Sequence, residues 1–506
     1  MRHRLIRSHQ TRLAPAFLAA AVLVVAFASS SVPADTGVVD VSRSPRTAEG
    51  EEFVTVNPLD ASNIIVGSNL WQPLTLQNVG NVSVTPDGFT FCGVWSSHDG
   101  GRTWSGGMRS NGGLQPIDSP LGDIPPPSAG VTVPGEFRAP GNLISADQSI
   151  VFDRHGNGYF ECEDFGLGRQ GDSTVDVYRS TNGGRTWSGP IVAFSQLATQ
   201  ILIDRPFLAI DNTGGPRDGT IYLTWETMFY QGWLPEVYAR SSTDGGLTWS
   251  KITRVDDDAH RAAWDPRQYP VVGADGALSV LYDAAPFVSP APFDPGRDNV
   301  QLMVARSTDG GKTFGRTVVE PSAHRVSSND EAYSYFSELI GAIAADPVHG
   351  GRIAIAWPDD RSGESRILLR YTTNGGKTWS KPLDVADDPP GHGNQHDHVG
   401  LTYLPDGRLV VVWRDRRSSG GGWSTPFQVF ARALRVSRSG ELVPGRTVQV
   451  TNGPQQPTTG TRGNMPSEYL SVTADTAGLA VAWDQMRGTL PDDVFRRIPL
   501  SVFGAR

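Results

Sequence analysis

Charged and aromatic residues stand at two recurring places in this 506-residue chain, before and after short apolar runs. The residues before the runs are Asp147-Gln148, Asp204-Arg205-Pro206, Arg267-Gln268-Tyr269, Ser337-Glu338, His396-Asp397-His398 and Glu468-Tyr469. Those that end the runs that follow are Glu163-Asp164, Glu226, Asp283, Asp359-Asp360-Arg361, Arg414-Asp415-Arg416-Arg417 and Asp484. Carboxylates can transfer protons, arginines can bind anions through paired hydrogen bonds, and tyrosine can act as a nucleophile. If the fold brings these places together, they form a polar site.

An octapeptide rich in glycine sets the spacing between these places. Its five copies are residues 97–104 (SHDGGRTW), 180–187 (STNGGRTW), 242–249 (STDGGLTW), 307–314 (STDGGKTF) and 372–379 (TTNGGKTW). Their starts lie 83, 62, 65 and 65 residues apart, and a nearly constant period indicates repeated supersecondary units. Asp or Asn before Gly-Gly supplies the positive φ angles of a tight hairpin turn, and the final aromatic residue can fill the gap between sheets. We therefore expect these residues to hold turns rather than to do chemistry.

The octapeptide resembles the Asp-box, or bacterial neuraminidase repeat, of the sialidase-like β-propellers. Apolar runs accompany each copy in the number expected of the four antiparallel strands of one blade. Residues 399–417 and 468–488 keep the strand pattern without the octapeptide, which brings the number of repeats to seven. We therefore predict an all-β propeller of seven four-stranded blades, with six blades, the number in sialidases, as the alternative. Residues 37–42 resemble the last strand of other blades, and we predict that they complete the final blade and close the ring.

The composition is that of a globular β protein with many turns, with 38% hydrophobic residues, 57 glycines and 37 prolines. A closed ring of repeats can hold this length as one unit, so we expect a single propeller domain from residue 35 to residue 506. Residues 106–142 form an insertion rich in glycine and proline. We expect this insertion to lack regular structure and to lie on the same face as the central pocket.

The first 34 residues have the pattern of a secretory signal peptide. Four arginines and no acidic residue precede an apolar run over residues 13–28. We therefore expect a secreted, extracellular protein with no stable membrane insertion after cleavage, and a retained membrane anchor is the alternative. Loss of four positive charges would take the formal net charge from −9 to −13, which argues against nucleic acid as a partner. We expect a monomer.

The chain has two cysteines, Cys92 and Cys162, in strand-like runs of the first and second repeats. Export would allow them to form a disulfide between adjacent blades. The sequence does not determine the distance between their Cα atoms, so paired and free cysteines are both open.

The resemblance implies three catalytic groups at the strand starts. A sialidase uses a tyrosine nucleophile assisted by a glutamate, with an aspartic acid as general acid. Tyrosine serves in place of a carboxylate because the carboxylate of the sugar would repel an anionic nucleophile. Tyr469 resembles the family's nucleophile, Glu338 its partner and Asp147 the acid.

The resemblance also implies arginines that bind the substrate carboxylate. Arg205, in the run DRPF, stands where the family's inner-strand arginine would, although the run FRAP at residues 137–140 has the closer spelling. Arg267 and Arg414, or another arginine of residues 414–417, would complete the set. A structural ion pair is the alternative for the last group, because similar Trp-Asp-Arg strand ends recur in more than one repeat.

His396 and His398 lie on one face of a strand, so both imidazoles can reach one ligand. We expect them to bind the substrate by hydrogen bonds. We expect no cofactor and no metal ion, because no third ligand is identifiable by its spacing.

The predicted function is hydrolysis of a terminal sialic acid, of the exo-α-sialidase type, or of a related bond in a glycan or glycoconjugate. One alternative is a propeller that binds glycan or protein without cleaving it. Another is a propeller hydrolase or lyase of a different polysaccharide, because fold does not determine function.

Overall fold

The computed structural model describes seven β-sheets and the turns that join them. The described residues are 35–43, 48–72, 89–110, 113–114, 144–165, 172–197, 202–228, 235–263, 267–284, 299–324, 326, 341–422, 425–437, 440–456, 469–487 and 490–504. The predicted signal peptide, Glu338 and most of the insertion, residues 111–112 and 115–142, lie outside them. Within the described ranges, no helix is long and apolar enough to cross a membrane.

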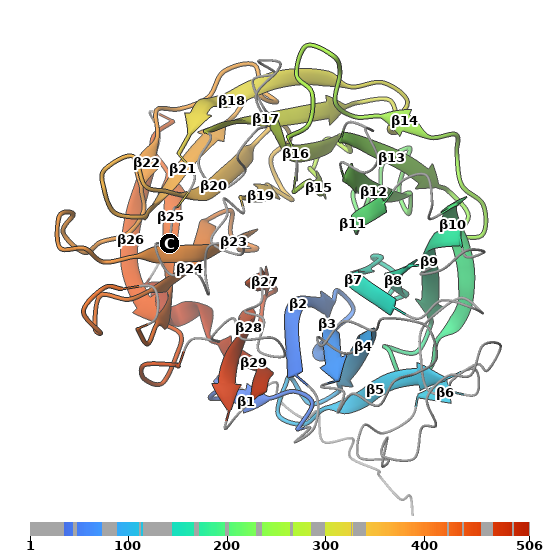
Figure 1. Ribbon diagram of the computed structural model, residues 1–506, viewed down its shortest axis with the longest axis horizontal. Coiled ribbons are helices and arrows are strands. Elements are labelled where there is room, and N and C mark those ends of the chain that lie inside the picture. The colour runs from blue at the N-terminus through green and yellow to red at the C-terminus, as the bar shows by residue number, and fades with distance from the viewer. Residues whose placement is uncertain are drawn as a thin grey trace, which may run out of the picture. The chain divides into compact units, whose positions relative to one another are not determined.

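Seven antiparallel sheets form a ring, and each is one blade (Figure 1). From the inner strand outward, blades 1 to 3 are β2 (Ala48–Asn57), β3 (Asp60–Gln72), β4 (Phe89–Ser97), β5 (Ser105–Ser110) and β6 (Gly113–Leu114); β7 (Ile144–Phe152), β8 (Gly158–Phe165), β9 (Asp172–Ser180) and β10 (Ser188–Leu197); and β11 (Leu202–Ile210), β12 (Ile221–Met228), β13 (Glu236–Ser242) and β14 (Thr253–Arg254).

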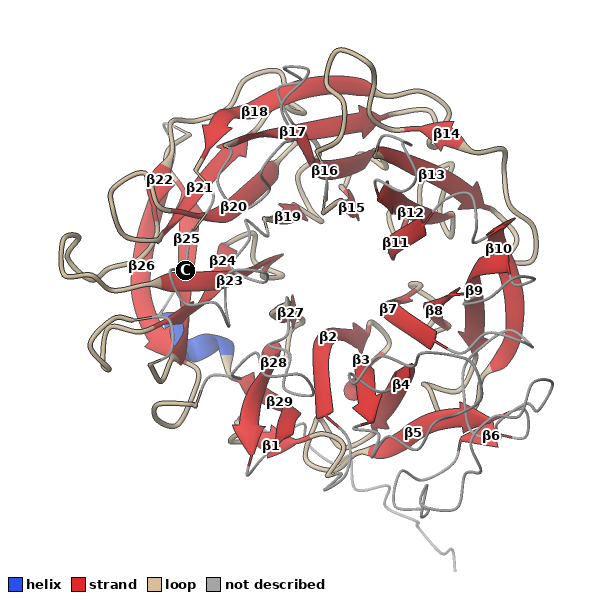
Figure 2. Cartoon of the chain, in the orientation of Figure 1, coloured by secondary structure: helices blue, strands red, loops and turns tan. Residues whose placement is uncertain are grey.

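Blades 4 to 7 follow the same order. They are β15 (Tyr269–Val272), β16 (Leu278–Ala284), β17 (Val300–Ser307) and β18 (Gly315–Ala323); β19 (Ala342–Ala345), β20 (Ile353–Asp359), β21 (Arg366–Thr372) and β22 (Leu383–Asp384); β23 (His396–Tyr403), β24 (Leu409–Asp415), β25 (Gln428–Val436) and β26 (Leu442–Gln449); and β27 (Ser471–Ala474), β28 (Leu479–Arg487), β29 (Leu490–Ile498) and β1 (Val39–Asp40). A single 3-10 turn, η2 (Leu500–Phe503), follows the last described strand (Figure 2). The predicted seven-bladed propeller is confirmed.

The second strand of a blade is deeply buried because it has a strand on each side and a neighbouring blade on each face. Every residue of β16, β20 and β24 is buried, and such strands are continuous apolar runs. Four tryptophans at the fifth position of their second strands are fully buried: Trp225, Trp357, Trp413 and Trp483. Each belongs to a cluster of apolar side chains from two neighbouring blades. The core is therefore a series of layers between blades.

The octapeptides form turns between the third and fourth strands, as predicted. In the third copy, Ser242 Oγ donates to Asp244 Oδ1 and accepts from the backbone N–H of Gly246. The hydroxyl of Thr248 donates to the other oxygen of Asp244, and Trp249 Nε1 donates to the carbonyl of Gly246. Gly246 has φ of +87°, a conformation that residues with a Cβ rarely adopt. The side chains of Ser242, Asp244, Thr248 and Trp249 thus all hold the turn.

The N-terminal strand closes the ring, as predicted. Val39 pairs with Phe495 and Asp40 pairs with Val494, so β1 is the fourth strand of blade 7. Arg496 strengthens this junction with a salt bridge of 2.8 Å to Asp35. The edge that β29 would otherwise expose is covered.

The start of the insertion differs from the expectation. Residues 105–110 form β5, the fourth strand of blade 1, and residues 113–114 form β6, which adds a fifth strand. The expectation that the whole insertion lacks regular structure is therefore wrong for its first residues. The reason is that blade 1 needs an outer strand after its octapeptide, whatever the local composition.

A disulfide joins Cys92 on β4 to Cys162 on β8, so it links blade 1 to blade 2. The two Cα atoms are 6.3 Å apart, which is within the range that a disulfide spans. This contact settles the question that the sequence left open.

Candidate active site

The two faces of the ring carry different residues. Because the strands of each blade alternate in direction, the octapeptide turns lie on the same face as the turns between first and second strands. The starts of the first strands and the ends of the second strands lie on the other face, called here the strand-start face. The first strands β2, β7, β11, β15, β19, β23 and β27 surround the centre of the ring (Figure 1).

Backbone conformations of high energy mark the strand-start face. Among the described residues, five other than glycine have positive φ in or just before the first strands: Glu51 (60°), Asp147 (51°), Arg205 (49°), Arg267 (48°) and His398 (46°). All except Arg267 lie at bulges in the pairing of the first strand with the second. A bulge redirects a side chain, and strained positions of this kind are concentrated at functional sites. Glycine would adopt the same backbone conformation at lower energy. That other residues stand at these positions indicates that their side chains are needed there.

Four aromatic rings from four blades meet at the centre of this face. Phe53, Phe207, Tyr269 and Tyr469 form one cluster. Phe207 and Tyr269 are stacked with ring centroids 4.7 Å apart, and Tyr469 lies 5.5 Å from Phe53. The starts of these inner strands therefore converge, as the sequence register predicts.

Arg205 connects this cluster to buried carboxylates. Its Nε donates a hydrogen bond of 2.9 Å to Tyr469 Oη, and its Nη1 lies 3.4 Å from Glu226 Oε1. Glu226 also accepts from the backbone N–H of Gln268. Gln268 in turn donates through its amide to the carbonyl of Arg205, so the next blade holds the bulge in place. Two sequence-predicted residues, Arg205 and Tyr469, are thus in direct contact.

Three carboxylates lie beside Arg205. Oxygens of Asp147, Glu163 and Asp204 are all within 4.8 Å of one another. Burial raises the pKa of Glu163 well above its ordinary value, and the charges of Asp147 and Asp204 raise it further. Asn69 orients Asp147, because its Oδ1 accepts from the Asp147 backbone N–H at 2.9 Å. The residue predicted as general acid therefore belongs to a cluster.

Arg414 is engaged in an ion pair. Its Nη2 contacts Asp484 Oδ1, and its guanidinium lies over the ring of Phe427, 4.7 Å from the centroid. The neighbouring Arg416 forms a 3.0 Å salt bridge to Asp397. These contacts correspond to the structural ion pairs that the sequence left as the alternative for this group.

His396 and His398 have separate partners. His396 is fully buried, with Nδ1 2.7 Å from the carbonyl oxygen of Ser365 and Nε2 3.1 Å from Asp388 and 3.2 Å from Asp415. Burial alone would lower the pKa of His396, but its hydrogen bonds to Asp388 and Asp415 raise it to about 9. Both ring nitrogens of His396 are used inside the protein, which leaves no ring N–H for a substrate. His398 Nδ1 lies 3.3 Å from Asp397, and its positive φ places it with the other strand-start residues.

Asp147, Arg205, Arg267 and Tyr469, which were predicted from the sequence as site residues, lie on this face. Glu51, Asn69, Glu163 and Asp204 also lie there but were not predicted as site residues. A recognisable signal for Glu51 is a charged residue two positions before an aromatic one. That pattern is shared by Glu51 and Phe53, by Arg205 and Phe207, and by Arg267 and Tyr269. No local pattern distinguishes Glu163 from the other acidic strand ends. Glu338, the predicted partner of the tyrosine, lies outside the described residues.

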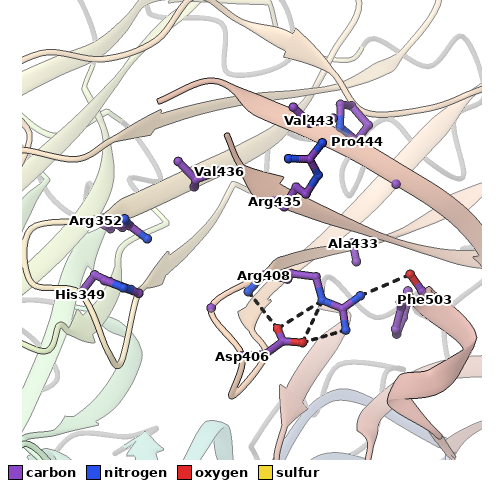
Figure 3. Close-up of a pocket in the computed structure, with 12 residues that line it drawn as sticks. His349, Arg352, Asp406, Arg408, Ala433, Arg435, Val436, Val443, Pro444 and Phe503 are labelled. Carbon is purple, nitrogen blue, oxygen red and sulfur yellow. Dashed lines mark hydrogen bonds and ion pairs between the residues drawn. The ribbon is translucent and has the colours of Figure 1, made fainter. Parts of the chain in front are cut away.

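A cavity of about 320 Å³ lies on the opposite face, beside the turns of blades 5 and 6 and near Phe503 (Figure 3). Several of its charged groups are paired with one another or with neighbouring residues. Arg408 Nη2 lies 2.8 Å from Asp406, and its Nη1 donates to the carbonyl of Phe503. Arg352 lies 3.5 Å from Asp346. The residues with strained backbone at the inner strands, and the buried carboxylate of Glu163, lie on the strand-start face, so we place the candidate active site there.

Comparison with known proteins identifies the repeat. The family model of the BNR/Asp-box repeat matches residues 370–381, which include the whole of the fifth octapeptide. The sialidase of Micromonospora viridifaciens is 24% identical over 347 residues, which are 55% of this chain and 49% of that protein. The matched stretch is therefore about half the length of this curated relative.

Solved structures with low sequence identity match over most of the chain. A protein of unknown function from Dyadobacter fermentans is 14% identical, with a TM-score of 0.46 over 92% of this chain and 99% of that one. An α-L-arabinofuranosidase from Fusarium graminearum is 12% identical, with a TM-score of 0.45 over 80% and 99%. A Trypanosoma rangeli sialidase in complex with sialic acid is 14% identical, with a TM-score of 0.40 over 71% and 55%. The octapeptide turns, the ring of seven blades and the matched repeat confirm the resemblance seen in the sequence: the chain is a seven-bladed β-propeller with a BNR/Asp-box repeat, similar to the sialidase-like propellers.

Proposed function

We propose that the chain is a glycoside hydrolase that cleaves a terminal acidic sugar, with sialic acid as the first candidate, on the strand-start face. The observation that carries this proposal is the hydrogen bond from Arg205 Nε to Tyr469 Oη, between residues 264 positions apart. It joins an anion-binding group to a nucleophile of the kind that hydrolysis of an acidic sugar uses. The similarity to a sialidase over about half of the chain supports the same substrate class.

In the proposed mechanism, Arg205 and Arg267 bind the carboxylate of the sugar. Both are buried, with 6% and 2% of their surface exposed, so a bound carboxylate would interact with them in a medium of low dielectric constant. Their positive φ angles place both side chains at the strand-start face before the substrate arrives. The expected result is selection of acidic over neutral sugars.

Tyr469 Oη attacks the anomeric carbon while the bond from that carbon to the leaving oxygen breaks. Asp147 gives a proton to the leaving oxygen, and the phenol proton passes to Glu338, the base expected from the sequence. The Nε–H of Arg205 stabilises the negative charge that develops on the phenol oxygen. Water then cleaves the bond between tyrosine and sugar, so the configuration of the anomeric carbon is retained.

The test is release of the fluorophore from an aryl glycoside of sialic acid by the purified protein. Tyr469→Phe keeps the ring that packs on Phe53 and Phe207 but removes the nucleophilic oxygen. We expect kcat to fall by at least about 100-fold with little change in thermal stability. Unchanged turnover would remove Tyr469 from the mechanism. If the folded wild-type protein shows no turnover, sialic acid is not the substrate.

One observation favours a second candidate function, a propeller that binds a glycan without cleaving it. Only 4% of the surface of Tyr469 is exposed, and its ring packs in the aromatic cluster, as a structural residue would. A sialylated oligosaccharide that binds with measurable heat in calorimetry and is recovered intact would support this second function.

A further inference from the structure

Three carboxylates from two blades converge on the strand-start face. Asp147 lies on β7, Glu163 on β8 and Asp204 on β11, and their oxygens are all within 4.8 Å of one another. Glu163 is the most enclosed of the three, with 1% of its surface exposed. Among the residues that the structure describes, neither of its carboxylate oxygens has a hydrogen-bond partner. A buried carboxylate without a partner is costly, so this arrangement requires a positive charge or a proton.

Among the described contacts of this cluster, the guanidinium of Arg205 lies beside Asp204, and other groups share it. Arg205 Nη1 lies 4.0 Å from Asp204 but 3.4 Å from Glu226, and Arg205 Nε is used by Tyr469. A single positive charge divided in this way does not balance three carboxylates. Addition of a divalent cation would balance these negative charges.

The three carboxylates are held on a rigid frame. The backbone N–H of Asp147 donates to Asn69, and that of Arg205 approaches Asp147 Oδ2 at 3.4 Å. The disulfide from Cys92 to Cys162 ties the residue next to Glu163 to blade 1. Ligand groups that are fixed before the ion arrives are what a specific metal site needs.

The separation of the oxygens, at most 4.8 Å, allows them to share one cation. Calcium binds carboxylate oxygens at about 2.3–2.6 Å, so two oxygens on one ion are at most about 5 Å apart. Magnesium binds at about 2.0–2.1 Å and retains several waters. We propose that Asp147, Glu163 and Asp204 form a site for a divalent cation of the size of Ca²⁺, which joins blade 2 to blade 3. This site differs from the expectation, drawn from residue spacing, that no metal ion binds.

Bound calcium has a consequence for the reaction that rests on the proposed function. Asp147 cannot donate a proton while it is a ligand to a cation. Calcium should therefore slow hydrolysis of alkyl sialosides, whose leaving oxygen needs a proton, more than hydrolysis of aryl sialosides, which leave readily without one.

The experiment that tests the site uses no substrate, so its result is independent of the proposed hydrolysis. The full mature protein is treated with a chelator, desalted and titrated with calcium chloride by calorimetry, and its melting temperature is measured with and without calcium. We expect one calcium per chain and a rise in melting temperature of a few degrees at saturation. Magnesium chloride, the size control, should bind at least about tenfold more weakly.

Glu163→Gln removes the charge but keeps the shape, and it should weaken calcium binding at least about tenfold. Glu161→Gln is the matched control, because Glu161 is also buried on β8 but does not belong to the three-carboxylate cluster. It should bind calcium as the wild type does. Asp204→Asn, at a more exposed position, serves if Glu163→Gln does not fold. No calcium binding by the wild type, equal affinity for magnesium, or unchanged affinity in Glu163→Gln and Asp204→Asn would overturn the proposal.

Discussion

Two clusters in the ring each hold three groups whose ligand atoms lie within 4.8 Å of one another, yet they are balanced in different ways. In the cluster of Asp388, His396 and Asp415, the imidazole lies between the two carboxylates. Arg417 forms a 2.6 Å salt bridge to Asp415, and Arg366 lies 3.2 Å from Asp388. The cluster of Asp147, Glu163 and Asp204 has no histidine and shares its arginine with other groups.

The difference shows how to distinguish buried carboxylates that stabilise the fold from buried carboxylates that can bind a ligand. Where the chain supplies its own cations, as around Asp415, the buried carboxylates hold two elements together and have no capacity left for an ion. Where the cation is shared with other groups, as Arg205 is beside Glu163, the same geometry is costly without a ligand. The spacing of carboxylates alone would not distinguish these two cases.

The largest effect that would test this comparison is expected from Asp415→Asn. The substitution removes the fully buried one of the two carboxylates that lie beside both His396 and the half-buried Arg417, so we expect the free energy of unfolding to fall by about 3–5 kcal/mol. Urea denaturation monitored by tryptophan fluorescence measures it. A loss below about 1 kcal/mol would mean that the internal cations are not what stabilises this cluster.

Removal of the disulfide next to the cluster of Asp147, Glu163 and Asp204 should have the next largest effect. Replacing both Cys92 and Cys162 with serine removes a link between residues 70 positions apart, for which we expect a loss of about 2–4 kcal/mol in the free energy of unfolding. Calcium affinity should also fall, because Cys162 precedes Glu163. Wild-type protein reduced with dithiothreitol is the control and should behave like the double variant. An unchanged urea midpoint in both would contradict the expectation.

The pH dependence of stability should come from the cluster that contains His396. The pKa of His396 is raised to about 9 from an ordinary value of 6.5, so the folded protein holds a proton that the unfolded chain releases at lower pH. This contribution to stability is complete below about pH 6.5 and is lost as the pH rises through 9, with a slope approaching about 1.4 kcal/mol per pH unit. Urea midpoints measured from pH 6 to pH 10 would show it. His396→Gln should remove the slope, and an identical slope in that variant would assign the effect to another group.

The smallest effect is expected from Glu163→Gln in chelator. Without a cation, the change removes a buried charge that has no hydrogen-bond partner in the described structure, so we expect stability to change by less than about 1 kcal/mol. The same type of substitution would then be nearly neutral in one cluster and severe in the other. A loss similar to that of Asp415→Asn would show that Glu163 has a structural partner.

The fold could be predicted from local patterns. The Asx-Gly-Gly turn determines each hairpin by hydrogen bonds within eight residues, as between Ser242 and Thr248, and its period counts the blades. The closing strand was recognisable because residues 37–42 repeat the pattern of other outer strands. The alignment of the repeats also predicted that Asp147, Arg205 and Tyr469 lie near one another, at the starts of first strands. Their roles in a reaction stay predictions.

The partners of individual side chains could not be predicted. The arginine at position 414 was expected in a carboxylate-binding set, but it contacts Asp484 in the next blade. His396 was expected to bind substrate, but its Nε2 atom contacts Asp388 and Asp415 instead. Arginine, aspartate and histidine look alike in either role, because what distinguishes the roles is the residue that lies opposite.

The sequence by itself determined the seven blades, the turns and the strand starts at which polar residues gather, because those features depend on interactions between residues close in the chain. Only the tertiary structure decided which of these charged residues have a counter-charge beside them. Arg205 meets Tyr469 across 264 positions, and Asp147 meets Asp204 across the boundary between two blades. The physical reason is that burial and charge balance are set by whatever side chains the closed ring brings together from distant repeats.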